Sequence, residues 1–311
     1  MNITEWPIPK SLLDSPEVTN RNLLASKWRS SSIDEILNQY IKMTAHEAES
    51  FYINIFNQFP ELKLKGVGIE LGAGVAALSA VAAKVYPSID CIYAVELVPD
   101  VVRLLQSRTV EGFGTHCNSV VKPVIGSFDQ ISLPDNSVDF CIEFASLHHS
   151  HNLEKTLKEL SRVIKPSGFV VAIDRAHHNS LTDSQIEYML NVEYSDAWKK
   201  ENGYSPAPLS RRQNGEHEYR VKKWESDFAS AGFKVEKRIE LRKPGFKMFL
   251  RSVVLALPFM LRKKLNLLPS RVRPQSGEIM WRLLSFFGIR HSPIFTESAH
   301  DYTVFLARKQ S

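Results

Sequence analysis

A glycine turn near residue 72 carries the clearest chemistry in this 311-residue sequence. The apolar stretch 67–71 leads into Gly72 and Gly74, and small residues follow. Glycines at such a turn let the backbone approach a nucleotide cofactor, which a side chain would hold away. Glu96 stands 22 residues after Gly74, where a carboxylate can accept hydrogen bonds from both hydroxyls of a ribose. This spacing predicts a nucleotide-cofactor site.

Glu70 helps to choose between nucleotide cofactors. The spacing of Gly72, Gly74 and Ala77 also fits the dinucleotide fingerprint of NAD(P)-dependent oxidoreductases. A carboxylate at Glu70 would face the negative pyrophosphate of a dinucleotide, whereas a cofactor with a positive sulfonium and an amino group tolerates it. The sequence favours a sulfonium cofactor. An oxidoreductase, or a cofactor-binding protein without catalysis, is the alternative.

Histidines that follow predicted strands are candidates for a general base. Six of the ten histidines lie in three short stretches, at His148, His149, His151, His177, His178 and His217. A hydroxyl acceptor has a high pKa and gains from a base that titrates near neutral pH, as histidine does. The candidate catalytic residues are therefore His148, His149, His177 and His217. The alternative for the first two is simple packing in a loop.

A metal site is another interpretation of the same histidines. Asp174, His178 and Glu216 would add suitable ligand types, but their spacing matches no metal motif. The three cysteines are scattered and form neither a zinc-spaced cluster nor a disulfide framework, which favours a reducing compartment. We therefore assign no metal ligands.

Alternating strands and helices must position these residues. Strands are expected near 66–71, 91–96, 120–126, 138–144, 168–174, 233–241 and 302–308. Helices are expected near 75–86, 99–109, 152–164, 182–200 and 221–231. The 43% of apolar residues suffice for a large core and exclude global disorder. The alternation predicts an α/β protein with a mostly parallel sheet and helices on both faces.

The first 60 residues are expected to cover this sheet. Prolines in the first 30 residues suggest an extended arm, and apolar residues between 33 and 59 recur as on one face of a long helix. The start of the sequence lacks a secretory-signal pattern. No window approaches the roughly 18 apolar residues needed to cross a bilayer. We expect a cytoplasmic protein, attached at most peripherally to a membrane.

In the order of its motifs, the sequence resembles class I S-adenosylmethionine-dependent methyltransferases, within the type 11 group of small-molecule enzymes. The glycine turn and Glu96 are followed by 126–139, which is similar to the family's adenine-binding stretch. Residues 143–149 match the loop after the fourth strand, and 157–169 match the next helix, turn and strand. Each piece is weak alone, but their order over about 66–175 is specific.

The resemblance implies a Rossmann-like sheet of seven strands with an antiparallel last strand, and helical insertions. It implies S-adenosylmethionine as cofactor, bound by Glu70, Gly72, Ala73, Gly74, Glu96, Leu97, Ser127, Phe128 and Glu143. Ser127 stands where the family usually carries an acid for the adenine amino group, a role that Asp129 could take instead. The expected reaction is methyl transfer to a hydroxyl or amine of a small-molecule, glycan-linked or lipid-linked acceptor.

The chain organisation follows from this resemblance. We expect an arm and cap helix over 1–60, the cofactor-binding domain over 61–242 and 300–311, and insertions over 176–220 and 243–299. Insertions beyond the carboxyl ends of such strands commonly form substrate lids.

The second insertion is unusually basic. Between Leu241 and Gly277 there are nine basic residues and no acidic one, beside an apolar run. This pattern suits attachment of 243–274 to an anionic membrane surface, or binding of a polyanionic or lipid-linked acceptor. The alternative is a lid helix packed on the domain. We do not expect nucleic acid as a partner, because the stretch has aliphatic residues where stacking aromatics would be needed.

Overall fold

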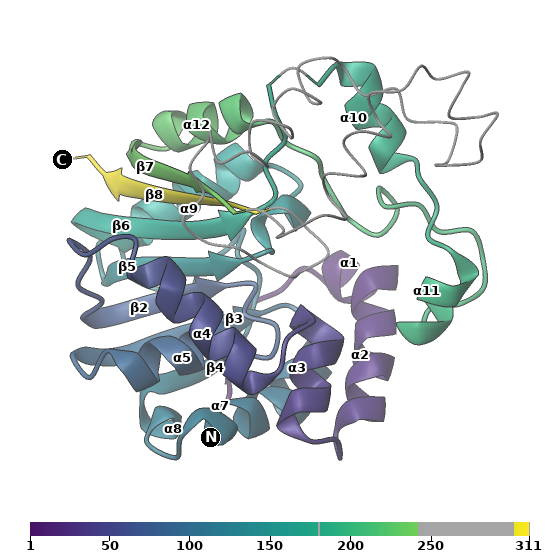
Figure 1. Ribbon diagram of the computed structural model, residues 1–311, viewed down its shortest axis with the longest axis horizontal. Coiled ribbons are helices and arrows are strands. Elements are labelled where there is room, and N and C mark those ends of the chain that lie inside the picture. Colours follow the sequence, from purple (N-terminus) through teal and green to yellow (C-terminus); the bar gives the residue numbers. More distant parts are fainter. Residues whose placement is uncertain (180, 242–301, 311) are drawn as a thin grey trace.

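The fold is one mixed β-sheet with helices packed on both faces (Figure 1). The computed structural model describes residues 1–179, 181–241 and 302–310. Within them the strands are β1 (Thr4–Glu5), β2 (Gly66–Leu71), β3 (Ile89–Glu96), β4 (Val121–Ile125), β5 (Val138–Phe144), β6 (Ile164–Asp174), β7 (Phe233–Glu240) and β8 (Thr303–Lys309). Their order in the sheet is β1-β4-β3-β2-β5-β6-β8-β7.

The pairing confirms the predicted fold class. Strands β1 to β6 pair in parallel, and β8 lies antiparallel between β6 and β7. The described sheet has eight strands and not the seven expected, because β1 adds a short parallel strand beside β4. The N-terminal arm thus contributes to the sheet edge, where Trp6 is buried.

The described helices fall into two groups around this sheet. They are α1 (Lys10–Leu13), α2 (Pro16–Trp28), α3 (Ile33–Ile41), α4 (Ala45–Phe56), α5 (Ala77–Val85), α6 (Pro99–Val101), the π-helix η1 (Val102–Gln106), α7 (Ser107–Phe113), α8 (Cys117–Val120), the 3-10 helix η2 (Leu147–His149), α9 (Leu153–Val163), α10 (Asp183–Leu190), α11 (Asp196–Glu201) and α12 (Val221–Ser230). Apolar side chains of α3, α4, α5 and α7 share one core with the sheet, and those of α9 and α12 share the other. The sheet is therefore covered on both faces, as predicted.

The first 56 residues are more helical than the predicted arm and single long helix. Pro16 is the first residue of α2, and the Ser15 side chain accepts a hydrogen bond from the Val18 N–H. Proline is favourable at this position, so the prolines that suggested an arm instead mark a helix start. The predicted long helix is divided because Lys42 adopts a left-handed conformation (φ 58°) and Thr44 forms a capping box at the start of α4.

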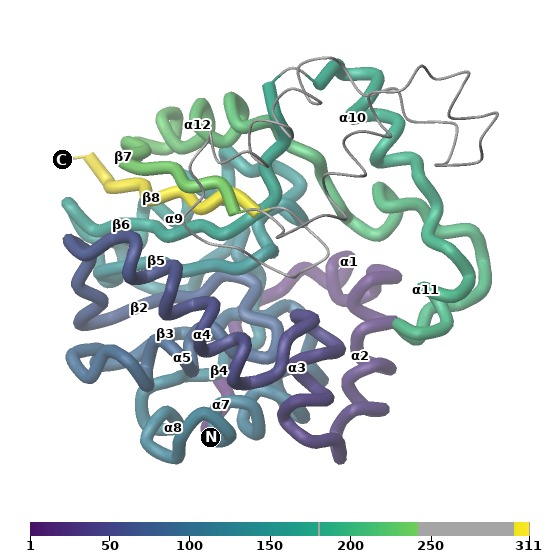
Figure 2. The backbone as a smooth tube through the Cα atoms, viewed as in Figure 1, coloured from purple at the N-terminus to yellow at the C-terminus, as the bar shows by residue number. Residues whose placement is uncertain are grey.

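The insertion 176–220 crosses the carboxyl ends of the strands. Figure 2 shows the chain running from β6 through α10 and α11, past α2, and back to α12. The predicted helix over 182–200 is two helices, because Ser195 caps a new helix at α11. The Gln39 side chain donates to Asn202 Oδ1 at 3.0 Å, which joins the end of α11 to α3.

Two further expectations concern the second insertion and the absence of a membrane-spanning helix. The second insertion, 243–299, lies outside the described residues. In the part of the chain that the structure describes, no helix is long and apolar enough to span a membrane.

Candidate active site

A cavity of about 640 Å³ lies where the parallel strands end. The register of the sheet aligns these ends: Leu71 pairs with both Val95 and Glu143, and Phe144 pairs with Ile173. The wall combines the glycine turn, the loop after β5, helix α2 and the insertion 176–220. The cavity therefore lies at the edge where the sequence places most of its candidate residues.

The two glycines of the turn serve different purposes. A side chain at Gly72 (φ +62°) would collide with the Ser146 side chain. At Gly74 (φ +49°), a Cβ would meet nothing within 4 Å, because this position faces the open cavity. Gly72 thus allows close packing inside the protein, whereas Gly74 leaves the backbone accessible to a ligand.

The peptide groups of Gly74 are held at both ends. Its N–H donates to Glu96 Oε2 at 2.9 Å, and its carbonyl accepts from Gln106 Nε2 at 2.8 Å. Glu96 Oε1 accepts from the Val98 N–H at 2.9 Å. Each carboxylate oxygen of Glu96 thus holds one backbone N–H and keeps a second acceptor position. Burial raises the pKa of Glu96, and the nearby Arg21 guanidinium opposes that shift.

Glu70 lies in the cavity wall and also caps helix α5. It accepts hydrogen bonds from the Ser79 N–H, at 2.9 Å, and from the Ser79 hydroxyl. The residue at the N-cap, Ala76, has no side chain that could accept them. Burial raises the pKa of Glu70 to about 8. The carboxyl group therefore has a structural task that the sequence did not reveal.

The other predicted cofactor residues divide by position. Ala73, Leu97, Ser127 and Phe128 line the cavity. Glu143 does not: it is fully buried behind the wall, where its Oε2 accepts from Ser146 N at 3.1 Å and Ser146 Oγ at 3.0 Å. Burial, with the charge of Asp174, raises the pKa of Glu143 well above its ordinary value. The structure thus places Glu143 as a support for the loop after β5.

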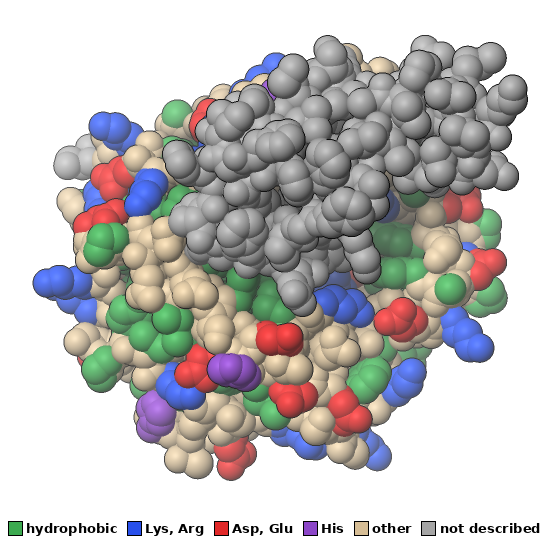
Figure 3. Space-filling model, in the orientation of Figure 1, with side chains coloured by type: hydrophobic (Ala, Val, Ile, Leu, Met, Phe, Trp, Pro, Cys, Tyr) green, Lys and Arg blue, Asp and Glu red, His purple; other side chains and the backbone are tan. Residues whose placement is uncertain are grey.

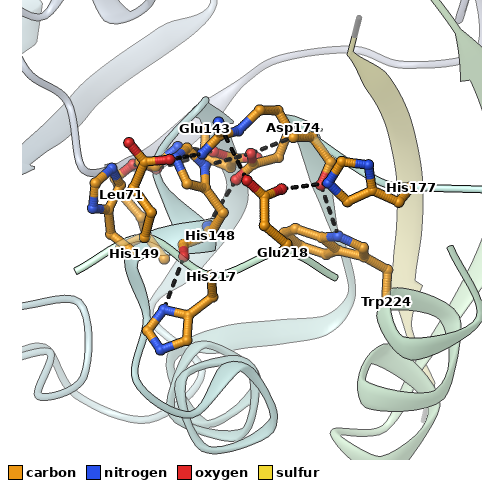
Figure 4. Close-up of polar contacts among 12 residues, drawn as sticks. Leu71, Glu143, His148, His149, Asp174, His177, His217, Glu218 and Trp224 are labelled. Carbon is orange, nitrogen blue, oxygen red and sulfur yellow. Dashed lines mark hydrogen bonds and ion pairs between the residues drawn. The ribbon is translucent and has the colours of Figure 1, made fainter. Parts of the chain in front are cut away.

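His148 and Asp174 form a buried pair in the cavity wall (Figure 4). His148 Nδ1 lies 2.6 Å from Asp174 Oδ1, and the His148 N–H donates to Asp174 Oδ2 at 3.0 Å. The carboxylate accepts the Nδ1–H, which leaves the lone pair on Nε2. Burial lowers the pKa of His148 to about 4 although Asp174 opposes the shift. The imidazole is therefore neutral at pH 7 and able to accept a proton.

His149 makes a looser contact with helix α2. Its ring centroid lies 4.4 Å from that of His148, and its Nδ1 lies 3.4 Å from Glu17 Oε1. Glu17 also forms an ion pair with Arg21 at 3.1 Å. Burial acts to raise the pKa of Glu17, but the charges of His149 and Arg21 outweigh it and hold that pKa at about 2. Helix α2 thus brings a carboxylate to the histidines.

His177 and His217 do not line the cavity. His177 Nε2 bonds to Glu218, and His217 Nδ1 lies 3.1 Å from the His148 carbonyl oxygen (Figure 4). The same carbonyl accepts from the backbone N–H of His217 at 2.9 Å. The first contact joins the two ends of the insertion 176–220, and the contacts of His217 attach the insertion to the loop that carries His148. In the described part of the chain, no group of three or more His, Cys, Asp or Glu side chains could hold a metal ion.

A buried ionic cluster completes the wall on the insertion side. Arg175 donates to Glu216 at 2.8 Å, and Arg211 donates to the same carboxylate oxygen at 2.7 Å. Burial acts to raise the pKa of Glu216, but Arg175 and Arg211 outweigh it and lower that pKa. Glu216 is therefore ionised and accepts hydrogen bonds. The cluster fixes residues 211–218 against the end of β6.

Comparison with known proteins identifies the domain. Residues 69–172 match the family model described as a methyltransferase domain. These residues form a class I methyltransferase domain. The match confirms the resemblance predicted from the order of the sequence motifs, and it covers the glycine turn and Glu96. S-adenosylmethionine is the cofactor of this domain.

Relatives of the methyltransferase domain are distant. Malonyl-[acyl-carrier protein] O-methyltransferase of Methylococcus capsulatus is 23% identical over 156 residues, which are 49% of this chain and 50% of that protein. The chain thus covers about half the length of this relative.

Two solved structures are similar to this chain in fold. One, from Bacillus halodurans C-125, is named as a methyltransferase and is 16% identical, with a TM-score of 0.51 over 84% of this chain and 100% of that chain. The other, from Galdieria sulphuraria, is named as a sarcosine dimethylglycine methyltransferase and is 17% identical, with a TM-score of 0.51 over 85% of each chain.

The residues of the methyltransferase domain fit its cofactor. The turn at Gly74 offers an open cradle, and the two remaining acceptor positions of Glu96 suit the two hydroxyls of a ribose. Helix α2 adds Glu17 and Arg21 to the same cavity. Sequence reasoning missed Gln106, because its contact with Gly74 bridges 32 residues and has no motif.

Proposed function

We propose that the chain transfers a methyl group from S-adenosylmethionine to a hydroxyl of an acceptor, with His148 as the general base. The observation that carries this proposal is the buried His148–Asp174 pair in the wall of the cofactor cavity. An alcohol needs a base because its pKa is high, whereas an amine that is already neutral does not. Among the predicted acceptors, the pair thus favours a hydroxyl on a small, glycan-linked or lipid-linked molecule.

The residues of the site have separate tasks in this reaction. When bound, S-adenosylmethionine supplies an activated methyl group. We assign Glu96 to the ribose, the turn at Gly72 and Gly74 to the backbone approach, and Ser127 and Phe128 to the adenine side. Positioning of this kind supplies most of the catalysis in a methyl transfer.

His148 would remove the acceptor proton. Asp174 holds Nδ1–H and orients the ring, so that Nε2 would take the proton of the acceptor hydroxyl as that oxygen receives the methyl group that S-adenosylmethionine would supply. The imidazolium that forms is stabilised by the adjacent Asp174 carboxylate. His148 is 5% exposed, so little of its ring contacts solvent.

The insertion 176–220 is the proposed substrate lid. Its Asn214, Gly215 and Glu216 line the same cavity as the glycine turn. The backbone bond from His217 to the His148 carbonyl ties this wall to the loop that carries the base. Acceptor choice would then depend on the insertion more than on the domain.

For the location of the protein, we propose that residues 243–274 attach it to an anionic membrane surface. The proposal rests on the sequence of 243–274, which lies outside the described residues. Figure 3 shows Lys/Arg and Asp/Glu side chains interspersed on the described surface of the face in view. Cosedimentation with anionic vesicles at low salt, but not with neutral vesicles, is the expected result. Equal partitioning to both vesicle types would instead favour the lid interpretation of that segment.

A labelled-transfer assay tests the base. The chain is incubated with methyl-labelled S-adenosylmethionine and a panel of alcohols, glycosides and amines. His148→Ala should lower the rate on an alcohol by about 10²- to 10⁴-fold at saturating cofactor. The matched control is His46→Ala, because His46 is exposed on α4. A rate within a few fold of the parent for His148→Ala would remove the base from the proposal.

A further inference from the structure

Helix α2 places a charged side chain, Arg21, in the wall of the cofactor cavity. The helix precedes the residues that match the methyltransferase domain, so Arg21 belongs to no part of that match. The Arg21 side chain is 33% exposed. Because Arg21 lines the cavity and keeps this exposed surface, a ligand bound there can reach its guanidinium group.

The fold holds α2 beside the end of strand β3. The Val18 side chain of α2 is buried in the core that the helices share with the sheet. The residue after Arg21 is Asn22, whose Oδ1 accepts from the Asp100 N–H at 2.9 Å. Asp100 lies in α6, four residues after Glu96. Arg21 is therefore held next to the strand end that carries the predicted ribose ligand.

Arg21 and Glu96 line the same cavity without contacting each other. Among the described residues, the ion pair of Arg21 is with Glu17, and none joins it to Glu96. The two groups still interact through space. Burial raises the pKa of Glu96 and Arg21 opposes that shift, while Glu17 and Glu96 act against burial to raise the pKa of Arg21. A ligand group that lies between the two side chains can contact both.

A ribose hydroxyl has the chemistry that this position requires. Each hydroxyl has one O–H donor and two acceptor lone pairs. Its proton can go to Glu96, since each oxygen of that side chain keeps one acceptor position beyond the backbone N–H that it holds. The lone pairs of the same hydroxyl can then accept from Arg21. The guanidinium has five N–H donors, and its Nη2 lies 3.1 Å from Glu17 Oε1, so other donors remain for a ligand.

The surroundings of Arg21 disfavour an anionic ligand at the same position. The pKa of Glu17 is about 2, so its carboxylate is ionised and offsets the charge of Arg21. A phosphate or carboxylate of an acceptor would meet a cation that is already paired, and it would lie beside the Glu96 carboxyl group. A neutral hydroxyl keeps the ion pair and uses the remaining N–H donors.

We infer that Arg21 donates a hydrogen bond to a ribose hydroxyl of S-adenosylmethionine whose proton Glu96 accepts, so that helix α2 completes the cofactor site from outside the matched domain. The inference rests on the proposed assignment of Glu96 to the ribose, and it adds a second residue that binds the same sugar. Loss of Arg21 should raise the KM for S-adenosylmethionine and leave kcat nearly unchanged.

Calorimetry with S-adenosylhomocysteine and its 2′-deoxy and 3′-deoxy analogues tests the inference. Arg21→Met should weaken binding of S-adenosylhomocysteine by about 10- to 100-fold, the loss of a hydrogen bond from a charged donor. For at least one analogue the effect should shrink to about 3-fold or less, because the hydroxyl that Arg21 contacts is then missing. Arg21→Lys should recover part of the affinity. The matched control is Lys27→Met, because Lys27 is an exposed cation of the same helix.

The three ligands separate the possible failures. A purely structural role of Arg21 would weaken all three ligands equally in Arg21→Met, and that result, or unchanged affinity for S-adenosylhomocysteine, would overturn the inference. Urea unfolding checks that each variant folds, and Arg21→Lys supports the same comparison if Arg21→Met does not fold. Equal binding of all three ligands by the parent chain would overturn the assignment of Glu96 to the ribose. Absence of S-adenosylhomocysteine binding by the parent chain would overturn the proposed function itself.

Discussion

The two sides of the cavity are built by different kinds of contact. On the cofactor side, the turn at Gly74 is held by Glu96 and Gln106 through backbone groups. On the side proposed for the acceptor, here called the acceptor side, His148 and the insertion 176–220 are held mainly by buried side-chain pairs such as His148–Asp174 and Arg175–Glu216. The cofactor side thus depends on backbone shape, and the acceptor side depends on charge pairing. Changes on the two sides should therefore have different effects.

The largest effect is expected from the Asp174 carboxylate. Asp174→Asn should lower the rate of methyl transfer by about 10²-fold or more, because an amide can present its N–H to Nδ1 and stabilises the imidazolium less well. Cofactor affinity should stay near that of the parent, since Asp174 lies on the acceptor side. Labelled transfer and calorimetry measure the two quantities. Asp183→Asn is the control, because Asp183 is exposed on α10. If Asp174→Asn lowered the transfer rate and the cofactor affinity equally, the cofactor side and the acceptor side would not act independently.

The next effect is on stability and concerns Arg175. Arg175→Met should lower the free energy of unfolding by about 3 kcal/mol, because it leaves buried carboxylates with fewer partners. Arg211 still faces Glu216, so the loss should stay at the lower end for a broken buried pair. Urea unfolding measures it. Arg238→Met, at a surface pair with Glu225, should change stability far less. Similar losses in both variants would contradict the importance of the cluster.

Glu96 tests the cofactor side alone. Glu96→Ala should weaken binding of S-adenosylhomocysteine by about 1–3 kcal/mol, since it removes two hydrogen-bond acceptor positions and leaves the Gly74 N–H without its partner. Acceptor KM should change little. The control is Glu111→Ala, an exposed residue of α7. Unchanged affinity in Glu96→Ala would show that the ribose binds elsewhere.

The smallest expected effect is the contribution of His148 to the pH dependence of stability. The folded pKa of His148, about 4, lies below its ordinary value of 6.5, so the unfolded chain binds more protons between these values. Its contribution to stability is thus present above pH 6.5 and is lost as pH falls toward 4. The rate at saturating substrates should also persist below pH 6.5. A His148→Ala variant should lose this part of the pH dependence of unfolding. If the stability of the His148→Ala variant still falls as the pH drops below 6.5, the titrating group is not His148.

The cofactor side of the cavity could be predicted from the sequence to a greater extent than the acceptor side. The glycine turn, Glu96 and the strand order are encoded by local patterns, and the structure places them as expected. The starts of α2 and α4 were missed because single capping residues, Ser15 and Thr44, decide them. His148 was a candidate among four, since only the folded sheet brings Asp174 to it.

The acceptor wall could not be predicted because its contacts join distant segments. Glu17 contacts His149, which is far from it in the sequence, and Arg175 contacts Glu216 near the other end of the insertion. Neither Glu17 nor Glu216 belongs to a motif. Glu70 has a second role that the sequence did not predict: it lines the cavity, and it also caps α5.

Calorimetric titration of the chain with S-adenosylhomocysteine and, separately, with NAD tests the central claim most directly. The methyltransferase family match, the open turn at Gly74 and the two acceptor positions of Glu96 together predict saturable binding of S-adenosylhomocysteine and none of NAD. Binding of NAD without binding of S-adenosylhomocysteine would contradict the account and favour an oxidoreductase.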